Sequence, residues 1–422
     1  MNEITMASPP LGPTAPVSEI LLAGIAIRIE LPPSLHWLAI ERYEAIRKHI
    51  EREGSPLHDK VVWFYPQGSM AIKATIKSRR RQDGYDIDIV IELLLPVTIT
   101  PAQILDLLYE AIKGEKGSIY YDMVERQTRC VTVYYADGMH LDVTPSILLD
   151  ENDPRRSHIF HAKLEEPTTA HKRVVMNSWA FCEHFNRALP PDLLFEQAYA
   201  KRARDGMKVL ADAEVKPVPA HSTMEGGKSA AVVGLQLLKR NRNMRYAKRV
   251  GVRMPPSVMM AKFAADCQLP TGTICGALEV ISGAMLSALL AAEMRNELVD
   301  VRNPTCNEDC FTDRWPENRA AQQTYISDLK LFRQQLHALM NGALGLDEMQ
   351  ELLIEMFGEG PARSAVEEQA RMLGRAVETG VRGIGVTGRV IPAAVIASPS
   401  IITSAMAKPR AHTFYGERWP KK

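Results

Sequence analysis

The sequence has few cysteines and almost no excess charge of either sign. Its 422 residues include six cysteines at irregular spacing, too few for the disulfide framework of a secreted protein, which predicts a reducing, cytoplasmic location. The 51 lysines and arginines are balanced by 50 aspartates and glutamates, which leaves a net charge of +1. This balance excludes general electrostatic attraction to nucleic acid or to a membrane surface, so any site for an anion must be local.

Signals for secretion, membrane insertion and zinc binding are also missing. The amino terminus is rich in proline and lacks a basic region followed by an apolar run, so no signal peptide is predicted and residues 1–31 are expected to form a flexible tail. The apolar stretch 273–292 contains Glu279 and several small residues, which favours a helix buried in protein. Cys306 and Cys310 lack a second ligand pair at zinc-finger spacing, so no metal is expected there.

The periodicity of apolar residues divides the chain into two lobes. A long amphipathic helix at 32–54 is followed over 61–143 by short alternating segments typical of strands, with one helical segment among them. Beyond residue 165 nearly every segment, 171–189 included, has the apolar spacing of a helix. We therefore predict an α+β fold with a mixed sheet in one lobe, an all-helical second lobe, and the active site in the cleft between them. The predicted parts are a flexible tail at 1–31, a sheet-bearing lobe at 32–164, a helical lobe at 165–373 and an extended tail at 374–422.

An aspartate pair stands at the front of an otherwise apolar strand. In the segment 85–93, Asp86 and Asp88 are separated by one isoleucine, so both side chains point to one face while the isoleucines point to the core. Two carboxylates about 4 Å apart repel each other by roughly 4 kcal/mol at an effective dielectric constant near 20. The pair needs a cation or strong hydrogen bonds to remain ionised, and a divalent metal ion would supply this.

A third aspartate follows a predicted hairpin turn. Asp137 and Gly138 form the turn signal, and the strand after them places His140 and Asp142 on one face. One aspartate pair cannot fill the coordination shells of two metal ions, so a two-metal site requires a further acid. We expect Asp142 to meet the aspartate pair from an adjacent strand.

A glycine–serine pair precedes these aspartates. Gly68 and Ser69 follow a predicted strand, where a glycine lets a phosphate approach the backbone and a serine with the following helix start can donate hydrogen bonds to phosphate oxygens. Gly-Ser, then Asp-x-Asp, then an aspartate on a later strand resembles the constellation of the polymerase-β-like nucleotidyltransferases. The segments LQLLKRNRN, MPPSVMMAKFAA, RNPTCNEDCFTDRW and KPRAHTFYGE are similar, in this order, to motifs of the cGAS/DncV-like nucleotidyltransferases, bacterial relatives of cyclic GMP-AMP synthase and oligoadenylate synthase.

This resemblance implies an activity, a metal and further site residues. Members of the family bind nucleoside triphosphates between a nucleotidyltransferase lobe and a helical lobe and join them, with release of pyrophosphate, into cyclic di- or trinucleotides that activate a downstream effector in anti-phage defence. The expected cofactor is two Mg²⁺ ions, with Mn²⁺ as an alternative, held by Asp86, Asp88 and Asp142. Lys239 and Ser257 match the lysine and serine that hold the donor triphosphate. ATP is the expected substrate, with GTP or a pyrimidine triphosphate as alternatives.

The stretch from Lys239 to Arg253 supports part of this assignment. It contains seven basic residues and no acidic one, which suits the binding of a polyphosphate, although a solvated helix face would have the same composition. Activation by nucleic acid is not expected, because the net charge is near zero and no zinc-binding insertion of the animal type is visible.

Two basic motifs are placed outside the predicted site. EGGKS at 225–229 imitates the end of a Walker A motif but lacks the glycine five places before Gly227 and a buried strand upstream, so it is interpreted as the start of a helix with Ser229 as its cap. The bases at 73, 77 and 79–81 are interpreted as part of a polar loop.

Two alternative functions remain open from the sequence. One is a nucleotidyltransferase that modifies an antibiotic, a protein or an RNA end. The other is a catalytically silent nucleotide-binding protein, although such proteins commonly lose a metal-binding acid and all three are present here. The chain ends in RWPKK, which departs from the small last residue that some family members use for conjugation to a target, so conjugation is not expected.

Overall fold

The computed structural model describes residues 11–378 except 13–14, 78–84, 151, 154, 212–227 and 268–271, together with 382–384 and 390–392. The chain forms two compact units, residues 1–366 and 367–422. Helix α12 (Glu359–Glu378) ends inside the second unit, where β10 (Arg382–Ile384) and β11 (Val390–Pro392) form an antiparallel pair. The predicted tail from residue 374 is therefore helical over its first five residues.

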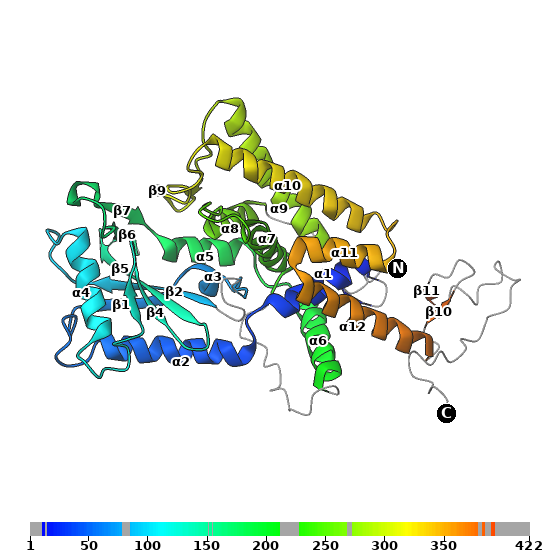
Figure 1. Cartoon of the computed structure of the whole chain (residues 1–422), viewed down its shortest axis with the longest axis horizontal. Coiled ribbons are helices and arrows are strands. Elements are labelled where there is room, and N and C mark those ends of the chain that lie inside the picture. The colour runs from blue at the N-terminus through cyan, green and yellow to red at the C-terminus, as the bar shows by residue number, and fades with distance from the viewer. Residues whose placement is uncertain are drawn as a thin grey trace, which may run out of the picture. The chain divides into compact units, whose positions relative to one another are not determined.

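A mixed sheet forms the centre of the sheet-bearing lobe (Figure 1). Its strands are β1 (Val61–Pro66), β2 (Asp86–Leu93), β3 (Val124–Arg126), β4 (Val131–Tyr134), β5 (His140–Leu148), β6 (Ser157–His161) and β7 (Lys172–Met176). The order is β1-β2-β5-β4-β3, with β6 paired to β5 and β7 paired to β6. Only β2 and β5 run parallel to each other; the other pairs are antiparallel.

Helices α2 (Pro33–Ile50) and α4 (Pro101–Lys113) pack on one face of this sheet. The isoleucines of β2 point to this side, and Ile87, Ile89 and Ile91 are each at most 1% exposed. Because side chains alternate along a strand, the even-numbered residues of β2 lie on the opposite face.

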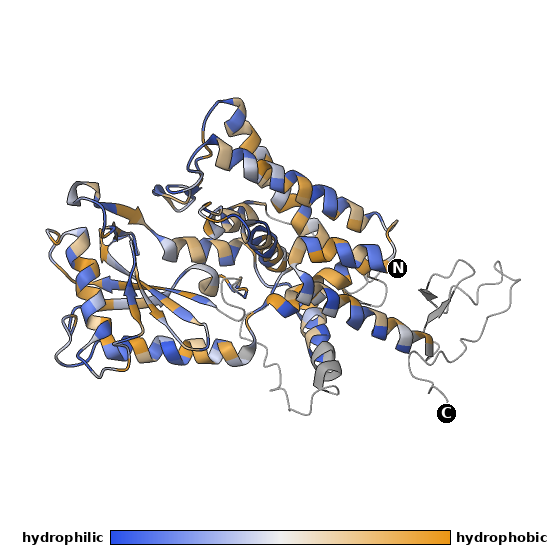
Figure 2. Cartoon of the chain, in the orientation of Figure 1, coloured by the Kyte–Doolittle hydropathy of each residue, from blue (hydrophilic) through white to orange (hydrophobic). Residues whose placement is uncertain are grey.

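The rest of the first unit is mostly helical, as the sequence predicted. Its helices are α1 (Val17–Ile29), α3 (Gly68–Ala71), α5 (Ser178–Ala188), α6 (Leu193–Ala211), α7 (Ala230–Tyr246), α8 (Ser257–Asp266), α9 (Ile274–Met294), α10 (Arg319–Met340) and α11 (Leu346–Phe357). A short hairpin of β8 (Arg302–Asn303) and β9 (Cys306–Cys310) interrupts them. Apolar and polar residues alternate along α10, as expected for a helix with one buried side (Figure 2).

The prediction of a flexible tail over residues 1–31 was wrong for its second half. Helix α1 packs on α7 and α9, and its Leu21, Leu22 and Ile25 are fully buried. The carboxylate of Glu19 accepts hydrogen bonds from the first backbone N–H groups of α9. The prolines before α1 suggested an irregular segment, but a run that is apolar all round is typical of a helix inside a core.

The predicted lobe boundary at 164/165 was also misplaced, because the sheet continues to Met176. Residues Lys172–Met176 form strand β7, although 171–189 was predicted to be one helix. The two central residues, Val174 and Val175, are β-branched and pair with β6. The helix α5 then starts at Ser178, with Asn177 as its side-chain cap.

Helix α9 is, among the described residues, the one helix long and apolar enough to cross a membrane by length and composition. It packs against α7 and α10, and Ile274, Leu278, Ile281 and Met285 are fully buried there. This packing is that of a core helix, as the sequence predicted.

Candidate active site

Three carboxylates meet on the sheet face opposite α2 and α4. Asp88 on β2 is the register partner of Asp142 on β5, and Asp86 is the partner of His140. Register partners on neighbouring strands project to the same face. The structure therefore brings the three predicted aspartates onto one face of two adjacent strands.

Two of these carboxylates are bonded to neighbouring side chains. Nε2 of His140 lies 2.7 Å from Oδ1 of Asp86, and the hydroxyl of Thr132 donates to Oδ1 of Asp142 at 2.5 Å. Among the residues that the structure describes, no three His, Cys, Asp or Glu side chains close around a common point as a metal cage. The site is a group of neighbouring carboxylates, two of which are bonded to side chains of the same chain, Asp86 to His140 and Asp142 to Thr132.

The electrostatic cost of this grouping falls on Asp88. Its pKa is raised to about 7, first by burial and then by the charges of Asp142 and Asp86, while Lys239 and His140 act in the opposite direction. Burial also raises the pKa of Asp142. These shifts have the sign expected for buried carboxylates that lie beside like charges.

Gly68 is required at its position by both backbone and space. Its φ is +59°, and a Cβ there would lie 2.4 Å from Oδ2 of Asp88. The backbone N–H of Gln67 donates to the carbonyl of Asp88 at 2.9 Å, which holds the loop against β2. The following helix α3 has only four residues, so the helix start expected after Gly68 amounts to a single turn.

Helix α7 joins the glycine–serine loop to the helical lobe. The buried Nζ of Lys239 donates to the carbonyl of Ala74 at 2.7 Å, and the amide of Gln236 donates to the carbonyl of Thr75 at 3.1 Å. The hydroxyl of Thr75 in turn donates to Oγ of Ser69 at 3.3 Å. Burial lowers the pKa of Lys239 to about 7. The amine therefore lies beside the loop that carries Ser69.

Ser257 is connected to the same region through Arg242. This arginine follows Lys239 by one turn of α7, and its Nη1 donates to Oγ of Ser257 at 2.9 Å and to the carbonyl of Pro255 at 2.6 Å. Burial lowers the pKa of its guanidinium, and the charge of Asp86 acts in the opposite direction. Ser257 is thus connected through Arg242 to the helix that carries Lys239.

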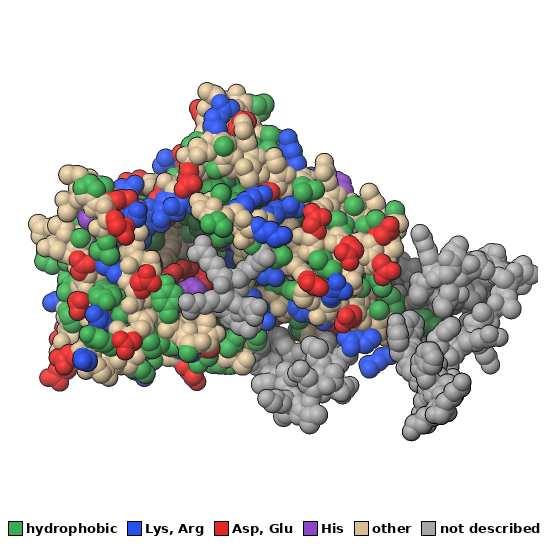
Figure 3. All heavy atoms as spheres, viewed as in Figure 1, with side chains coloured by type: hydrophobic (Ala, Val, Ile, Leu, Met, Phe, Trp, Pro, Cys, Tyr) green, Lys and Arg blue, Asp and Glu red, His purple; other side chains and the backbone are tan. Residues whose placement is uncertain are grey.

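Figure 3 shows a hollow in the surface of the molecule. In the same view, Figure 1 draws α3 and the start of β2 in the lower part of this area, and β9 and α8 above them. Acidic and histidine side chains lie at its lower edge, and lysine or arginine side chains gather at its upper edge. This distribution suits a ligand that carries both metal ions and phosphates.

Sequence reasoning did not assign several residues that hold the site together. His140 and Thr132 bond the aspartates, and Thr75, Gln236 and Arg242 position the residues predicted for phosphate binding. The alternation of β5 placed His140 on the correct face. The others depend on strand register and on contacts between the lobes, for which the sequence has no local signal.

The motif at 225–229 was interpreted as the start of a helix, and its described part confirms this interpretation. Ser229 caps α7 by accepting from the N–H of Val232 at 3.4 Å, and Lys228 pairs with Glu30. Residues 225–227 and 79–81 lie outside the described residues. Cys306 and Cys310 are free thiols.

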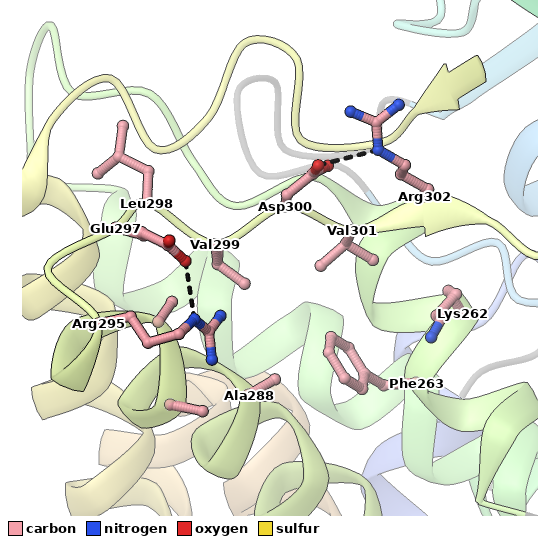
Figure 4. Close-up of a pocket in the computed structure, with 12 residues that line it drawn as sticks. Lys262, Phe263, Ala288, Arg295, Glu297, Leu298, Val299, Asp300, Val301 and Arg302 are labelled. Carbon is pink, nitrogen blue, oxygen red and sulfur yellow. Dashed lines mark hydrogen bonds and ion pairs between the residues drawn. The ribbon is translucent and has the colours of Figure 1, made fainter. Parts of the chain in front are cut away.

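A separate pocket of about 300 Å³ lies at the carboxyl end of α9, between α8 and residues 297–302 (Figure 4). None of the predicted site residues lines it. Its charges are paired locally, so it offers no excess positive charge to a triphosphate. The ion pairs are Lys262–Asp266, Arg295–Glu297 and Arg302–Asp300.

The sheet, its neighbouring aspartates and the glycine–serine loop define a nucleotidyltransferase of the polymerase-β type. Residues 36–157 match the family described as the Second Messenger Oligonucleotide or Dinucleotide Synthetase domain. The chain is 39% identical over 414 residues, 97% of each protein, to the cyclic dinucleotide synthase CdnG of Bradyrhizobium diazoefficiens. It is 24% identical over 408 residues, 94% of this chain and 97% of the relative, to a c-di-GMP synthase of Roseivirga ehrenbergii.

The solved structure of Bradyrhizobium diazoefficiens CdnG in complex with GTP resembles this chain with a TM-score of 0.71 and 38% identity, over 82% of this chain and 97% of that one. The chain therefore belongs to the cGAS/DncV-like nucleotidyltransferases and is a cyclic oligonucleotide synthase. Enzymes of this family depend in general on metal ions and use nucleoside triphosphates. Because the 39% identity to a cyclic dinucleotide synthase extends over 97% of both proteins, it favours this activity over modification of an antibiotic, a protein or an RNA end.

Proposed function

We propose that this enzyme joins two nucleoside triphosphates into a cyclic dinucleotide, using Mg²⁺ held by Asp86, Asp88 and Asp142. The observation that carries the proposal is the placement of these three carboxylates on one face of two adjacent strands, with Asp88 directly against Gly68. A cyclic dinucleotide is proposed over a larger ring because the relative with 39% identity is named a cyclic dinucleotide synthase.

The residues present fit a divalent metal. Carboxylate oxygens are the ligands that Mg²⁺ prefers, and the raised pKa of Asp88 indicates a carboxylate that a cation would stabilise. Bound there, Mg²⁺ would neutralise charge on the transferring phosphate and favour ionisation of the attacking hydroxyl. Mn²⁺ has similar ligand preferences and is the alternative.

The donor triphosphate is proposed to bind Gly68, Ser69, Lys239 and Ser257. Gly68 has no side chain to block a phosphate, and the hydroxyls of Ser69 and Ser257 each have donor capacity. The ammonium of Lys239 has three donors, of which Ala74 uses one. Burial lowers the pKa of this amine to about 7, and an anionic partner would favour its charged form.

In the proposed reaction a ribose hydroxyl of the acceptor attacks the α-phosphorus of the donor. The new O–P bond forms as the bond to the bridging oxygen breaks, and pyrophosphate leaves. We assign acceptance of the hydroxyl proton to Asp142, which lies on β5, one strand further from Gly68 than Asp88 does. The linear product would then rebind and be closed into a ring by the same chemistry.

GTP is proposed as a substrate, because one relative was solved with GTP and another is named a c-di-GMP synthase. ATP, expected from the sequence, stays a proposal for the second nucleotide. The product is proposed to act in the cytoplasm on an effector in anti-phage defence, following the role of the family.

Incubation with all four ribonucleoside triphosphates and Mg²⁺, followed by phosphatase treatment and mass spectrometry, tests the proposal. We expect a phosphatase-resistant cyclic dinucleotide that is missing with Asp86→Asn combined with Asp88→Asn. Resistant product at an undiminished rate from that double variant would overturn the proposed site. If every product contains only one nucleotide, the proposed joining of two nucleoside triphosphates is overturned.

A further inference from the structure

The hydroxyl of Thr132 is hydrogen-bonded to one of the three carboxylates of the site. Thr132 lies on β4 and is the register partner of Asp142 on β5. Its Oγ1 donates to Oδ1 of Asp142 at 2.5 Å, at the short end of the range for a hydroxyl bonded to an ionised carboxylate. Residues directly opposite each other in antiparallel strands have close Cβ atoms, so this contact follows from the register of the sheet.

The position of Thr132 is fixed by the strand that carries it. Val131 and Val133 are fully buried in the core on the side of α2 and α4, so the side chain of Thr132 points to the opposite face, where the aspartates lie. Thr132 itself is only 3% exposed, so solvent has little access to its hydroxyl. A β-branched side chain is also restricted in its χ1 rotation. The hydroxyl is therefore a donor with a defined position.

The carboxylate of Asp142 depends on a partner for its orientation. The terminal torsion of an aspartate is broad, so the strand fixes where this side chain begins but not how the carboxylate is rotated. Among the hydrogen bonds that favour the charged form of Asp142 and lower its pKa, the bond from Thr132 has the largest effect, ahead of that from Cys130. With Oδ1 held by Thr132, the carboxylate has one orientation.

The role assigned to Asp142 requires a fixed orientation, because a general base must lie within hydrogen-bond reach of the proton that it accepts. We propose that Thr132 is a positioning residue for nucleotidyl transfer, which holds Oδ1 of Asp142 so that the carboxylate keeps one orientation toward the acceptor hydroxyl. Thr132 acts through Asp142 and is assigned no contact of its own with the substrate or the metal. This inference rests on the proposed function.

Three substitutions at position 132 test the role of the hydroxyl. Thr132→Val and Thr132→Ala remove the donor, and valine keeps the shape of threonine, whereas Thr132→Ser keeps the donor. The assay is steady-state pyrophosphate release by the full-length enzyme, with GTP varied at fixed ATP and saturating Mg²⁺.

Loss of the donor should lower kcat and leave substrate binding intact. Removal of a group that orients a metal-binding carboxylate typically costs about 10–100-fold, and we expect a fall in kcat of that size in Thr132→Val and Thr132→Ala. Thr132→Ser should keep kcat within about twofold of the wild type, because its hydroxyl can make the same bond. The KM for GTP should stay nearly unchanged in all three variants, because the donor triphosphate is assigned to other residues.

Thr312→Val is the matched control for loss of a buried threonine hydroxyl. Thr312 lies between β9 and α10, and its hydroxyl accepts a hydrogen bond from the N–H of Val301 at 2.9 Å. Thr312→Val should lower the midpoint of urea unfolding, because the buried N–H of Val301 loses its acceptor, and it should leave kcat unchanged.

A second measurement tests the bond itself without metal or nucleotide. Thr132→Val is introduced into the wild type and into Asp142→Ala, and the midpoint of urea unfolding is compared in the two backgrounds. The substitution should lower the midpoint more in the wild type, because there it leaves the carboxylate of Asp142 without its donor.

Four outcomes would overturn the inference. They are wild-type kcat in Thr132→Val and Thr132→Ala, a loss in Thr132→Ser or Thr312→Val as large as in Thr132→Val, a raised KM with unchanged kcat, and equal shifts of the urea midpoint in the two backgrounds. In each case the wild-type enzyme still releases pyrophosphate, so the proposed function stands. If the wild-type enzyme releases no pyrophosphate, the proposed function fails, and the urea comparison still decides whether Thr132 holds Asp142.

Discussion

Substitution of Gly68 by alanine should inactivate the enzyme without unfolding it. An alanine Cβ would lie 2.4 Å from Oδ2, 3.1 Å from Cγ and 3.3 Å from Cβ of Asp88. Ordinary contact begins near 3.4 Å, so the carboxylate would have to retreat by about 1 Å. Misplacement of a reacting group by this distance can cost about 10²-fold in rate, which is the loss expected in kcat for pyrophosphate release.

The cost in stability should be smaller and can be measured separately. An alanine at φ +59° adopts a left-handed conformation, which costs roughly 1–2 kcal/mol. Gly342 offers a matched control, because its φ is +65° and nothing lies within 4 Å of an added Cβ. Gly342→Ala should lose a similar free energy of unfolding in a urea titration and keep full activity.

The comparison of the two glycine variants decides between strain and active-site displacement. If Gly68→Ala retains wild-type turnover while folded, Gly68 does not hold open the space beside Asp88. If both variants lose activity equally, backbone strain alone explains the loss.

Three further predictions concern the donor lysine, the first helix and the metal. Lys239→Met should raise the KM for the triphosphate at least tenfold, because it removes the proposed phosphate contact, and it should lower the melting temperature slightly, because the buried carbonyl of Ala74 loses its donor. An unchanged KM would remove Lys239 from the site. Glu19→Ala should lower the free energy of unfolding by about 2–4 kcal/mol, because two charge-assisted hydrogen bonds to the N–H groups of Ile274 and Cys275 are lost. Exposed Glu53→Ala is its control, and equal urea midpoints for the two variants would contradict the prediction. Chelation by EDTA should abolish pyrophosphate release, with recovery on addition of Mg²⁺; turnover that persists in EDTA would contradict metal dependence.

The parts of the site that were predictable from sequence are those set by local alternation. Asp86, Asp88 and Asp142 sit at strand positions whose faces follow directly from the apolar residues between them. Gly68 could be recognised as a position of close approach, although the sequence did not identify Asp88 as the group that approaches it.

The parts that were missed depend on packing between distant segments. Helix α1 (Val17–Ile29) has almost no amphipathic pattern, because it is buried on most sides, and nearby prolines masked its helical character. Strand β7 (Lys172–Met176) is defined by pairing with β6, which tertiary structure rather than propensity decides. The contact of Lys239 with Ala74 joins residues 165 positions apart and has no local signature.

Metal binding by the grouped aspartates tests the central claim most directly. The measurement is loss of the electron paramagnetic resonance signal of free Mn²⁺ on addition of protein with a non-hydrolysable GTP analogue, corrected for the nucleotide alone. We predict Mn²⁺ binding by the wild-type enzyme and by Asp137→Asn, which changes a turn aspartate paired with Arg42. Binding should be lost in Asp88→Asn, whose metal-free form should melt at a higher temperature because like-charge repulsion is relieved. Equal Mn²⁺ affinity in Asp88→Asn and the wild type would contradict the account.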